Sequence, residues 1–183
     1  MKEPTAKCLR DSYCANSMAH VRYLLYAQKA KEEGFPGIAH LFRALALSRY
    51  TRASEQYHLV NELIGTRTVS SDTYFTFART MDNLERARDA ETSDANDLLP
   101  AFAAMADSQG EEAAARSLKR SAAICRHRAA LLDEVIQETK HAAAEPAIDG
   151  LYVCRTCGYV TAKVVPEACP VCGTERTGFI AVV

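Results

Sequence analysis

The sequence predicts a mainly α-helical protein: an antiparallel four-helix bundle followed by a small β-type metal-binding unit. Two observations carry this prediction. Apolar residues recur at three- and four-residue steps through most of the first 144 residues, which is the spacing of one face of a helix. Short β-type stretches then surround two Cys-x-x-Cys pairs, a pattern typical of a small unit that folds around a metal ion.

The first two helices are predicted to form a hairpin. The first runs from Thr5 to about Gly34, which favours a helix C-terminus. The second begins at Pro36, which fits the first turn of a helix, and its apolar face continues to Leu63 and stops at Gly65. The expected apolar face of the first helix contains Leu9, Tyr13, Met18, Val21, Leu24, Leu25 and Ala27. Aromatic residues at helical spacing are expected mostly in the core: Tyr13, Tyr23, Tyr26, Phe42, Tyr50 and Tyr57.

Two further helices complete the predicted bundle. The third is expected from about residue 72 to residue 109, with Ser71 or Asp72 as its N-cap. Pro100 should kink or interrupt it. The fourth is expected over residues 111–144. Two tight joints and one longer connector between four long segments predict an antiparallel bundle.

Composition and charge exclude several classes of function. The formal net charge of −1 gives no bulk electrostatic basis for binding nucleic acid or an anionic membrane surface. No apolar run approaches the ~20 residues of a membrane span, and the N-terminus lacks the apolar core of a signal peptide. Cys8, Cys14 and Cys125 lie in helical pattern, where free cysteines usually act as small core residues. This cysteine usage fits a reducing compartment, so a cytoplasmic protein is expected.

The two Cys-x-x-Cys pairs are the strongest chemical signal in the chain. Each pair is followed by Gly, and the four thiols are Cys154, Cys157, Cys169 and Cys172. Two such turns facing each other make a closed tetrahedral site of four thiolates, which suits Zn²⁺ or a single iron. One pair alone could be a redox dithiol, but two pairs at this spacing favour a metal. We therefore predict a bundle over residues 1–146 and a metal-binding domain over residues 147–183, whose folding energy comes largely from the metal.

The residues around the cysteines bear on which metal is bound. Gly158-Tyr159 after the first pair and Pro170 inside the second resemble the metal-binding turns of rubredoxin. Tyr152 and Phe179 supply the apolar cover that tunes a thiolate-bound iron. One rubredoxin-type iron per chain is therefore favoured, and zinc, which uses the same four thiolates, is the alternative.

A helical bundle followed by rubredoxin-like turns resembles the rubrerythrins, across nearly all of the chain. The matching segments are Arg22-Tyr23, 30–35, 38–42, Asn83-Leu84, 100–102 and 110–118. The resemblance implies a ferritin-like bundle and a C-terminal rubredoxin-like domain. Family members reduce peroxide at a carboxylate-bridged di-iron site in the bundle, and the rubredoxin-like iron supplies the electrons. The resemblance also implies a homodimer, in which one subunit's rubredoxin-like unit lies near the other's bundle, with or without exchanged segments. An electron-transfer function would in addition need a redox partner protein.

The positions at which that family carries its di-iron ligands are mostly changed. In helix order they hold Asn16; Arg49 and Arg52; Glu91 and Asp94; and Cys125 and Arg128. Only the third helix keeps its carboxylates, the second of them shortened. Three arginines against two carboxylates would repel two iron ions, which need anionic ligands. A di-iron centre is therefore not expected.

Two interpretations of the changed positions are open. Arg49 and Arg52 share one helical face, as do Glu91 and Asp94, so the two pairs are predicted to face each other with Arg128 nearby. The first interpretation is a salt-bridged polar core that maintains the register of the bundle. The second is a pocket in which one unpaired arginine binds an anion or small molecule.

Two further residues near these positions are candidates for chemistry. Cys125 could be a redox thiol activated by Arg128, although a single Cys in an apolar stretch is more often an inert structural residue. His127 lies one residue before the former ligand position, which turns it about 100° around the helix. It is expected to be a flanking or partly buried histidine and not a ligand.

Three functions remain open from the sequence. The first is an electron-transfer protein with one iron on four cysteine thiolates and a bundle that lacks di-iron. The second is a non-redox binding or regulatory module in which Zn²⁺ holds the C-terminal domain together. The third is a peroxide reductase with an atypical site, which requires additional iron in the bundle.

Overall fold

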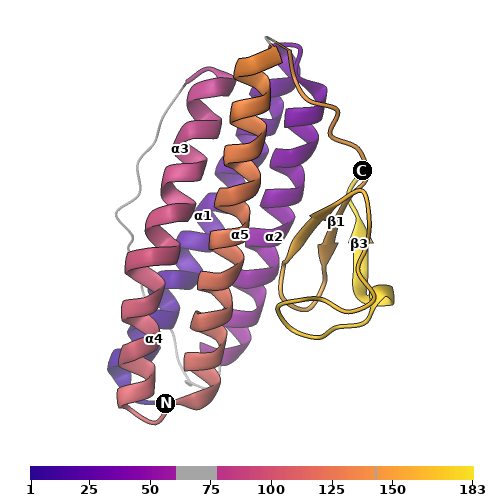
Figure 1. The fold of residues 1–183 in the computed structure, drawn as a ribbon. Coiled ribbons are helices and arrows are strands. Elements are labelled where there is room, and N and C mark those ends of the chain that lie inside the picture. Colours follow the sequence, from indigo (N-terminus) through magenta and orange to yellow (C-terminus); the bar gives the residue numbers. More distant parts are fainter. Residues whose placement is uncertain (61–77, 143) are drawn as a thin grey trace.

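A computed structural model of the chain describes residues 1–60, 78–142 and 144–183. Its long helices are α1 (Glu3–Glu32), α2 (Pro36–Val60), α3 (Thr80–Ser93), α4 (Leu99–Ser108) and α5 (Glu112–Ala142). They form an elongated bundle in which α3 and α4 follow each other along one edge (Figure 1). The predicted four-helix bundle with a small C-terminal β unit is confirmed.

The α1–α2 hairpin closes at the predicted glycine. Gly34 has φ +86°, a left-handed conformation that glycine adopts without steric cost. The Phe35 N–H then donates to the Ala30 carbonyl at 2.8 Å, which satisfies one of the last free carbonyls of α1. The expected end of the second helix at Leu63–Gly65 and the expected N-cap at Ser71 or Asp72 lie outside the described residues.

The third predicted helix is interrupted just before Pro100. A π-helical segment, η1 (Asp94–Leu98), separates α3 from α4, and Pro100 lies in the first turn of α4. Proline has no N–H to donate, and its ring clashes with the carbonyl four residues earlier. The break expected at Pro100 therefore falls in the π-helical segment just before the proline. Asp94 is the first residue of that segment.

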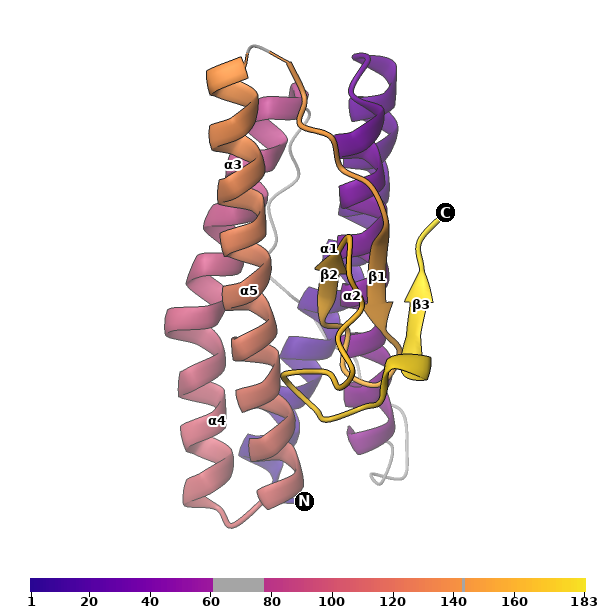
Figure 2. The same ribbon diagram turned by 45° about the vertical axis from the view of Figure 1, so that its right-hand side comes forward.

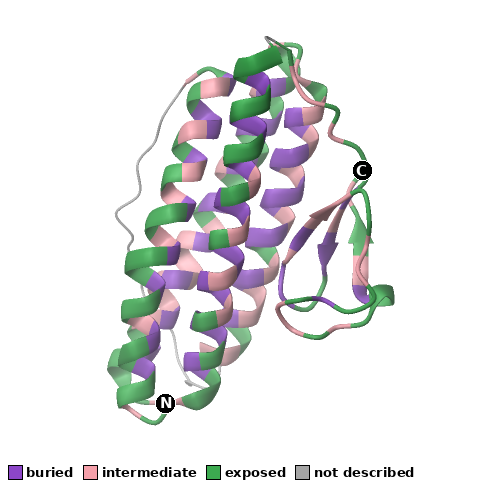
Figure 3. Ribbon diagram, in the orientation of Figure 1, coloured by how far each residue is buried: buried purple, intermediate pink, exposed green. Residues whose placement is uncertain are grey.

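The core runs along the inner faces of the helices, and the outer faces are exposed (Figure 3). The rings of Tyr23, Tyr26 and Phe42 are buried together, with centroids 5.4–6.2 Å apart. The expectation that Tyr50 and Tyr57 are core residues was wrong, because both are at least half exposed. Four residues of the expected apolar face of the first helix are also exposed: Met18, Val21, Leu24 and Leu25. Helical spacing alone does not tell an inner apolar face from an outer one.

The C-terminal domain is a three-stranded antiparallel sheet of β1 (Leu151–Cys154), β2 (Val160–Ala162) and β3 (Phe179–Ala181), in the order β2-β1-β3. The short helix η2 (Arg176–Gly178) precedes β3. Leu151, Val153 and Val160 belong to the same buried apolar cluster as residues of α2 and α5. The domain thus lies against α2 and α5 (Figure 2).

The expected boundary between residues 146 and 147 falls between α5 and β1. Within the described part of the chain, no helix combines the length and the apolarity that a membrane crossing requires.

Candidate metal centre and bundle cluster

The two metal-binding turns have the same backbone construction. The Gly158 N–H donates to the Cys154 carbonyl, and the Gly173 N–H donates to the Cys169 carbonyl, each at 2.8 Å. Both glycines have positive φ, +81° and +76°. A side chain at either position would be strained, so the glycine after each Cys-x-x-Cys pair lets the turn reverse and bring its two sulfurs to one side.

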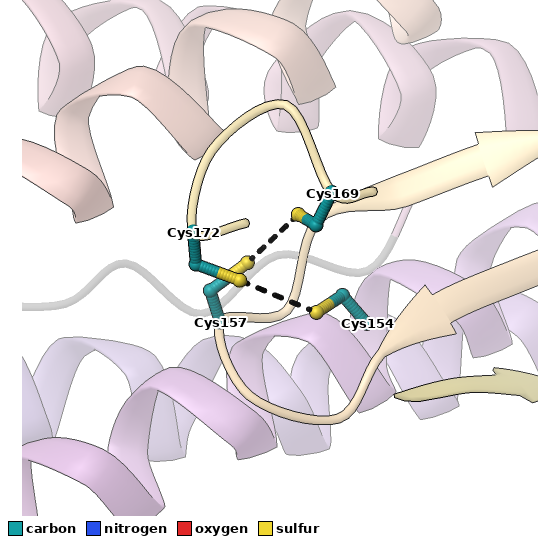
Figure 4. Close-up of side chains that lie close together, drawn as sticks. All are labelled: Cys154, Cys157, Cys169 and Cys172. Atoms are coloured by element: carbon teal, nitrogen blue, oxygen red, sulfur yellow. Dashed lines mark hydrogen bonds between the residues drawn. The ribbon is translucent and has the colours of Figure 1, made fainter. Parts of the chain in front are cut away.

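The four sulfurs have the spacing of a tetrahedral site (Figure 4). Cys154 and Cys172 are 3.6 Å apart at Sγ, and Cys157 and Cys169 are 3.5 Å apart. All four lie within 4.8 Å of one another. A metal–sulfur distance of ~2.3 Å gives a tetrahedron with edges of about 3.8 Å. The four residues therefore fit one four-coordinate metal ion, and together they are called the four-cysteine site below.

Burial and hydrogen bonding set the protonation of these thiols. Burial raises the pKa of both Cys157 and Cys169. Burial also acts to raise the pKa of Cys172, but hydrogen bonds from Thr174 outweigh it, and the pKa falls to about 7. Because a metal binds thiolates, loading the site must release protons.

Apolar side chains cover the cysteines from two domains. Phe179 and Tyr159 pack there from the C-terminal domain, and Ile124 packs there from α5. The side chain of His127, one turn along α5, stacks on Tyr159 with ring centroids 4.4 Å apart. Its Nε2 lies 2.7 Å from the Val160 carbonyl oxygen. Burial lowers the pKa of His127, so the neutral ring donates Nε2–H to that carbonyl, and His127 contacts the sheet and not the bundle cluster.

Glu91 is the centre of the polar cluster inside the bundle. The side chain is fully buried. Oε1 accepts from the Tyr23 hydroxyl at 2.8 Å and from Arg49 Nε at 3.1 Å. Oε2 lies 2.9 Å from Arg49 Nη2 and 2.8 Å from Arg128 Nη2. Burial acts to raise the pKa of Glu91, but Arg128 and Arg49 outweigh it and lower the pKa to about 2, so Glu91 is an anion at neutral pH.

Arg49 joins three helices through one guanidinium. Besides Glu91, it donates to Asn16 Oδ1 at 3.0 Å and to Asp94 Oδ2 at 2.9 Å. The Asn16 amide donates in turn to Gln56 Oε1 at 3.0 Å. Asn16 thus accepts from a cation at a position where the resemblance implies a metal-binding carboxylate.

Arg52 does not face Glu91 and Asp94, and this part of the prediction was wrong. It reaches α5, where Nε donates to Ser121 Oγ at 3.0 Å and Nη2 donates to Ser117 Oγ at 2.8 Å. Its carboxylate partner is Glu55, one turn along α2. Burial lowers the pKa of Arg52 to about 10, which leaves it charged at neutral pH. Glu55 also pairs with Arg120 at 3.4 Å, so Arg52 shares its carboxylate with a second arginine.

Cys125 is buried within this cluster and is not activated. Its sulfur lies 3.1 Å from Arg128 Nη2. Burial nevertheless raises the pKa of Cys125 to about 12, with Arg128 only partly offsetting it. A protonated, inaccessible thiol is a poor nucleophile, which supports the interpretation of Cys125 as a structural residue.

A cavity of about 10 Å³ lies beside the arginines, which is room for about one water molecule. Its lining includes Asn16, Arg49, Arg52, Asp94, Cys125 and Arg128. Arg128 Nε is buried with no hydrogen-bond partner among the described residues. The cavity is too small for an organic ligand.

Several residues of the cluster were not expected from the sequence: Tyr23, Ser48, Glu55, Gln56, Ser117 and Ser121. Helical spacing offered a signal for some of them. Glu55 follows Arg52 by three residues, and Ser121 precedes Cys125 by four. Residues at these spacings share a helix face.

Comparisons with known proteins agree on one family. The rubrerythrin family model matches residues 7–133, and the model of the rubrerythrin rubredoxin-like domain matches residues 152–180. A putative rubrerythrin of Methanocaldococcus jannaschii is 31% identical, over 98% of this chain and 92% of its own. Rubrerythrin-2 of Clostridium acetobutylicum is 29% identical, over 97% and 96%.

A solved structure of nigerythrin in a mixed-valent state has the same fold. It superposes with a TM-score of 0.86 at 24% identity, covering 99% of this chain and 88% of the nigerythrin chain. The sequence matches and the geometry of the four-cysteine site thus indicate the same family. The chain belongs to the rubrerythrin family, with a ferritin-like helical domain and a C-terminal rubredoxin-like metal-binding domain.

Proposed function

We propose that this protein is an electron carrier that uses one iron in its four-cysteine site and has no di-iron centre in its bundle. One observation carries the proposal: both carboxylate oxygens of Glu91 are bound by the guanidiniums of Arg49 and Arg128. A second observation concerns the four-cysteine site, where the sulfurs complete a tetrahedral shell.

The bundle cluster offers iron a poor set of ligands. Arginine presents only donors and stays protonated, so Arg49, Arg52 and Arg128 cannot bind a cation. Glu91, Asp94 and Cys125 do bring one ligand atom each within 4.8 Å of one another. A metal there would have to displace two guanidiniums and deprotonate a thiol whose pKa is about 12. The cluster therefore supports a salt-bridged polar core.

The four-cysteine site supports electron transfer better than catalysis on a bound substrate. Four protein ligands close a tetrahedral shell and leave no open position for a substrate, whereas catalytic metal sites keep one open. Iron held by four thiolates carries one electron at a time. A redox partner protein would supply or accept that electron.

Two other functions predict different metals. A zinc-holding binding or regulatory module would use the same four thiolates, because zinc also prefers this geometry. A peroxide reductase with an atypical site would need iron in the bundle in addition to the metal of the four-cysteine site.

We also propose that the protein is a homodimer that pairs through α1 and α2. Met18, Val21 and Leu25 are exposed at helical spacing on α1, with Val21 and Leu25 55% and 51% exposed. Tyr50 and Tyr57 of α2 are exposed as well. The two helices pack against each other, and exposed apolar and aromatic side chains on neighbouring helices are a feature of protein interfaces.

Metal content per chain, with a visible spectrum, tests the proposed function on protein purified without added metal. We expect one iron and a thiolate-to-iron charge-transfer spectrum. The variant Cys157→Ser should lose the iron and the colour, whereas the double variant Glu91→Gln/Asp94→Asn should keep both. Three irons per chain would overturn the proposal and favour a peroxide reductase. One zinc in a colourless protein would favour the binding module.

A further inference from the structure

Ser48 of α2 connects the bundle directly to the first metal-binding turn. The side chain is fully buried, and Oγ donates to the Gly158 carbonyl. The turn approaches α2 so closely that a Cβ at Gly158 would lie 2.7 Å from the Ser48 carbonyl oxygen. The backbone next to the ligand Cys157 is therefore held against a helix of the bundle.

The same hydroxyl is bound by the bundle cluster. Arg128 Nη1 donates to Ser48 Oγ at 2.8 Å, and Arg128 Nη2 is anchored on Glu91 at 2.8 Å. Because Ser48 Oγ accepts from a cation, its own proton is directed to the Gly158 carbonyl. A chain of donors thus runs from Arg128 through Ser48 to the C-terminal domain.

The last step of this chain passes through a single peptide group. The Gly158 carbonyl and the Tyr159 N–H belong to the same planar peptide unit. A backbone hydrogen bond joins the Tyr159 N–H to the Cys157 sulfur. Ser48 therefore polarises the peptide whose N–H points at a metal-binding sulfur, and hydrogen bonds arranged in series strengthen one another.

We propose that Arg128 and Ser48 are positioning residues that raise the electron affinity of the metal in the four-cysteine site, through a hydrogen-bond relay that passes along the Gly158–Tyr159 peptide to Cys157 Sγ. The proposal rests on the proposed function only in taking the metal to be iron. One electron added to Fe³⁺ gives Fe²⁺ and makes the four-thiolate site more negative. Donors that withdraw charge from a ligand sulfur stabilise that reduced state.

The arrangement gives Arg128 a function outside the bundle. It occupies a position where the resemblance implies a di-iron ligand, and it reaches a different metal site through Ser48. Its opposite charge is Glu91, which holds the guanidinium in place. The bundle cluster would then act as a fixed electrostatic support for the four-cysteine site of the same chain.

Spectroelectrochemical titration of Ser48→Ala tests the relay. We expect about a tenfold lower ratio of reduced to oxidised protein at a fixed potential, which corresponds to a midpoint about 59 mV lower. Ser121→Ala is the matched control. Ser121 is also a buried serine that binds an arginine of the cluster, Arg52 Nε at 3.0 Å, but its side-chain hydrogen bonds among the described residues go to α2 and α5 and not to the metal-binding turn. Its midpoint should equal that of the unchanged protein.

A second readout does not depend on iron being the native metal. With Co²⁺ in the four-cysteine site, the thiolate-to-cobalt charge-transfer band should move to lower energy in Ser48→Ala and stay in place in Ser121→Ala. The relay is refuted if both variants behave alike in both measurements. If the native metal proves to be zinc while the cobalt band shifts in Ser48→Ala alone, the relay stands and the electron-carrier proposal fails.

A second variant keeps the test valid if Ser48→Ala does not fold. Arg128→Lys keeps the charge but has a single ammonium group, which cannot reproduce the two-ended bridge from Glu91 to Ser48. Arg128→Lys should lower both the midpoint potential of the iron and the energy of the cobalt charge-transfer band, as Ser48→Ala does. Unchanged values in folded Arg128→Lys would overturn the relay.

Discussion

Replacing Glu91 with Gln would remove the negative charge at the centre of the bundle cluster while keeping its size. Glu91 accepts a hydrogen bond from Tyr23 and ion pairs with Arg49 and Arg128. After the change, Arg49 would keep its ion pair with Asp94, and Arg128 would have no carboxylate partner among the described residues. We expect Glu91→Gln to destabilise the bundle strongly.

Two estimates of the stability that Glu91→Gln would lose agree. Breaking a buried ion pair by removing one partner costs about 3–5 kcal/mol. The pKa of Glu91 falls from an ordinary 4.5 to about 2, and at 1.36 kcal/mol for each pKa unit this corresponds to about 3 kcal/mol. For a chain of this size, 1 kcal/mol moves Tm by roughly 2–4 °C. Glu91→Gln should therefore lower Tm by on the order of 10 °C.

The pH dependence follows from the sign of the pKa shift. A carboxyl group whose pKa is lower in the folded state stabilises the protein above its unfolded pKa and loses that effect as pH falls through the folded one. The difference in unfolding free energy between the unchanged protein and Glu91→Gln should have its full value above pH 4.5. It should shrink as the pH falls from 4.5 to 2. Urea unfolding followed by circular dichroism at several pH values measures it. Metal loss from the four-cysteine site in acid affects both proteins, so the difference isolates Glu91.

Glu85→Gln is the matched control. Glu85 forms an exposed ion pair with Lys140 at 2.6 Å, and such pairs contribute about 0–1 kcal/mol. Its unfolding free energy should stay close to that of the unchanged protein. If Glu91→Gln were no more destabilising than Glu85→Gln, or if its effect did not fade in acid, the salt-bridged core would be wrong.

Two further predictions concern the cysteines outside the metal site and the outer face of the hairpin. Alkylation with iodoacetamide followed by mass spectrometry should modify the partly exposed Cys8 and Cys14 in the folded protein, and Cys125 only after unfolding. Labelling of native Cys125 at the rate of Cys14 would contradict its burial and raised pKa. The double variant Val21→Glu/Leu25→Glu should convert the proposed homodimer to a monomer in light scattering with little change in Tm, because both side chains are already exposed. An unchanged protein that is itself monomeric at micromolar concentration would refute the dimer.

The bundle cluster shows how arginines can supply positive charge to a buried carboxylate in a helical scaffold. Buried anions need nearby positive charge, because desolvation strongly disfavours an isolated carboxylate. In a di-iron protein the metal ions supply that charge. Here Arg49 and Arg128 supply it to Glu91, and Arg52 pairs separately with Glu55. Most guanidinium donors of the cluster are bound by fixed protein partners, so the cluster is suited to a structural function.

The sequence by itself determined the architecture and the metal site. Helical periodicity with Gly34 and Pro36 predicts the first hairpin, and the spacing of four cysteines with a glycine after each pair predicts a tetrahedral thiolate site. Both are local patterns, in which residues a few positions apart set the backbone. For the same reason the break before Pro100 was foreseeable.

Only the tertiary structure determined which side chains of the bundle cluster pair with one another and where the C-terminal domain lies. Arg49 and Arg52 lie three residues apart, yet one binds Glu91 and the other turns to Ser117, Ser121 and Glu55. Helical spacing predicts which face of the helix a side chain lies on. The partner of a long side chain on that face depends on which neighbouring helix offers an acceptor. The contact from Ser48 to Gly158 joins residues 110 positions apart. No local pattern encodes such a contact, because it arises only when the sheet packs against α2 and α5.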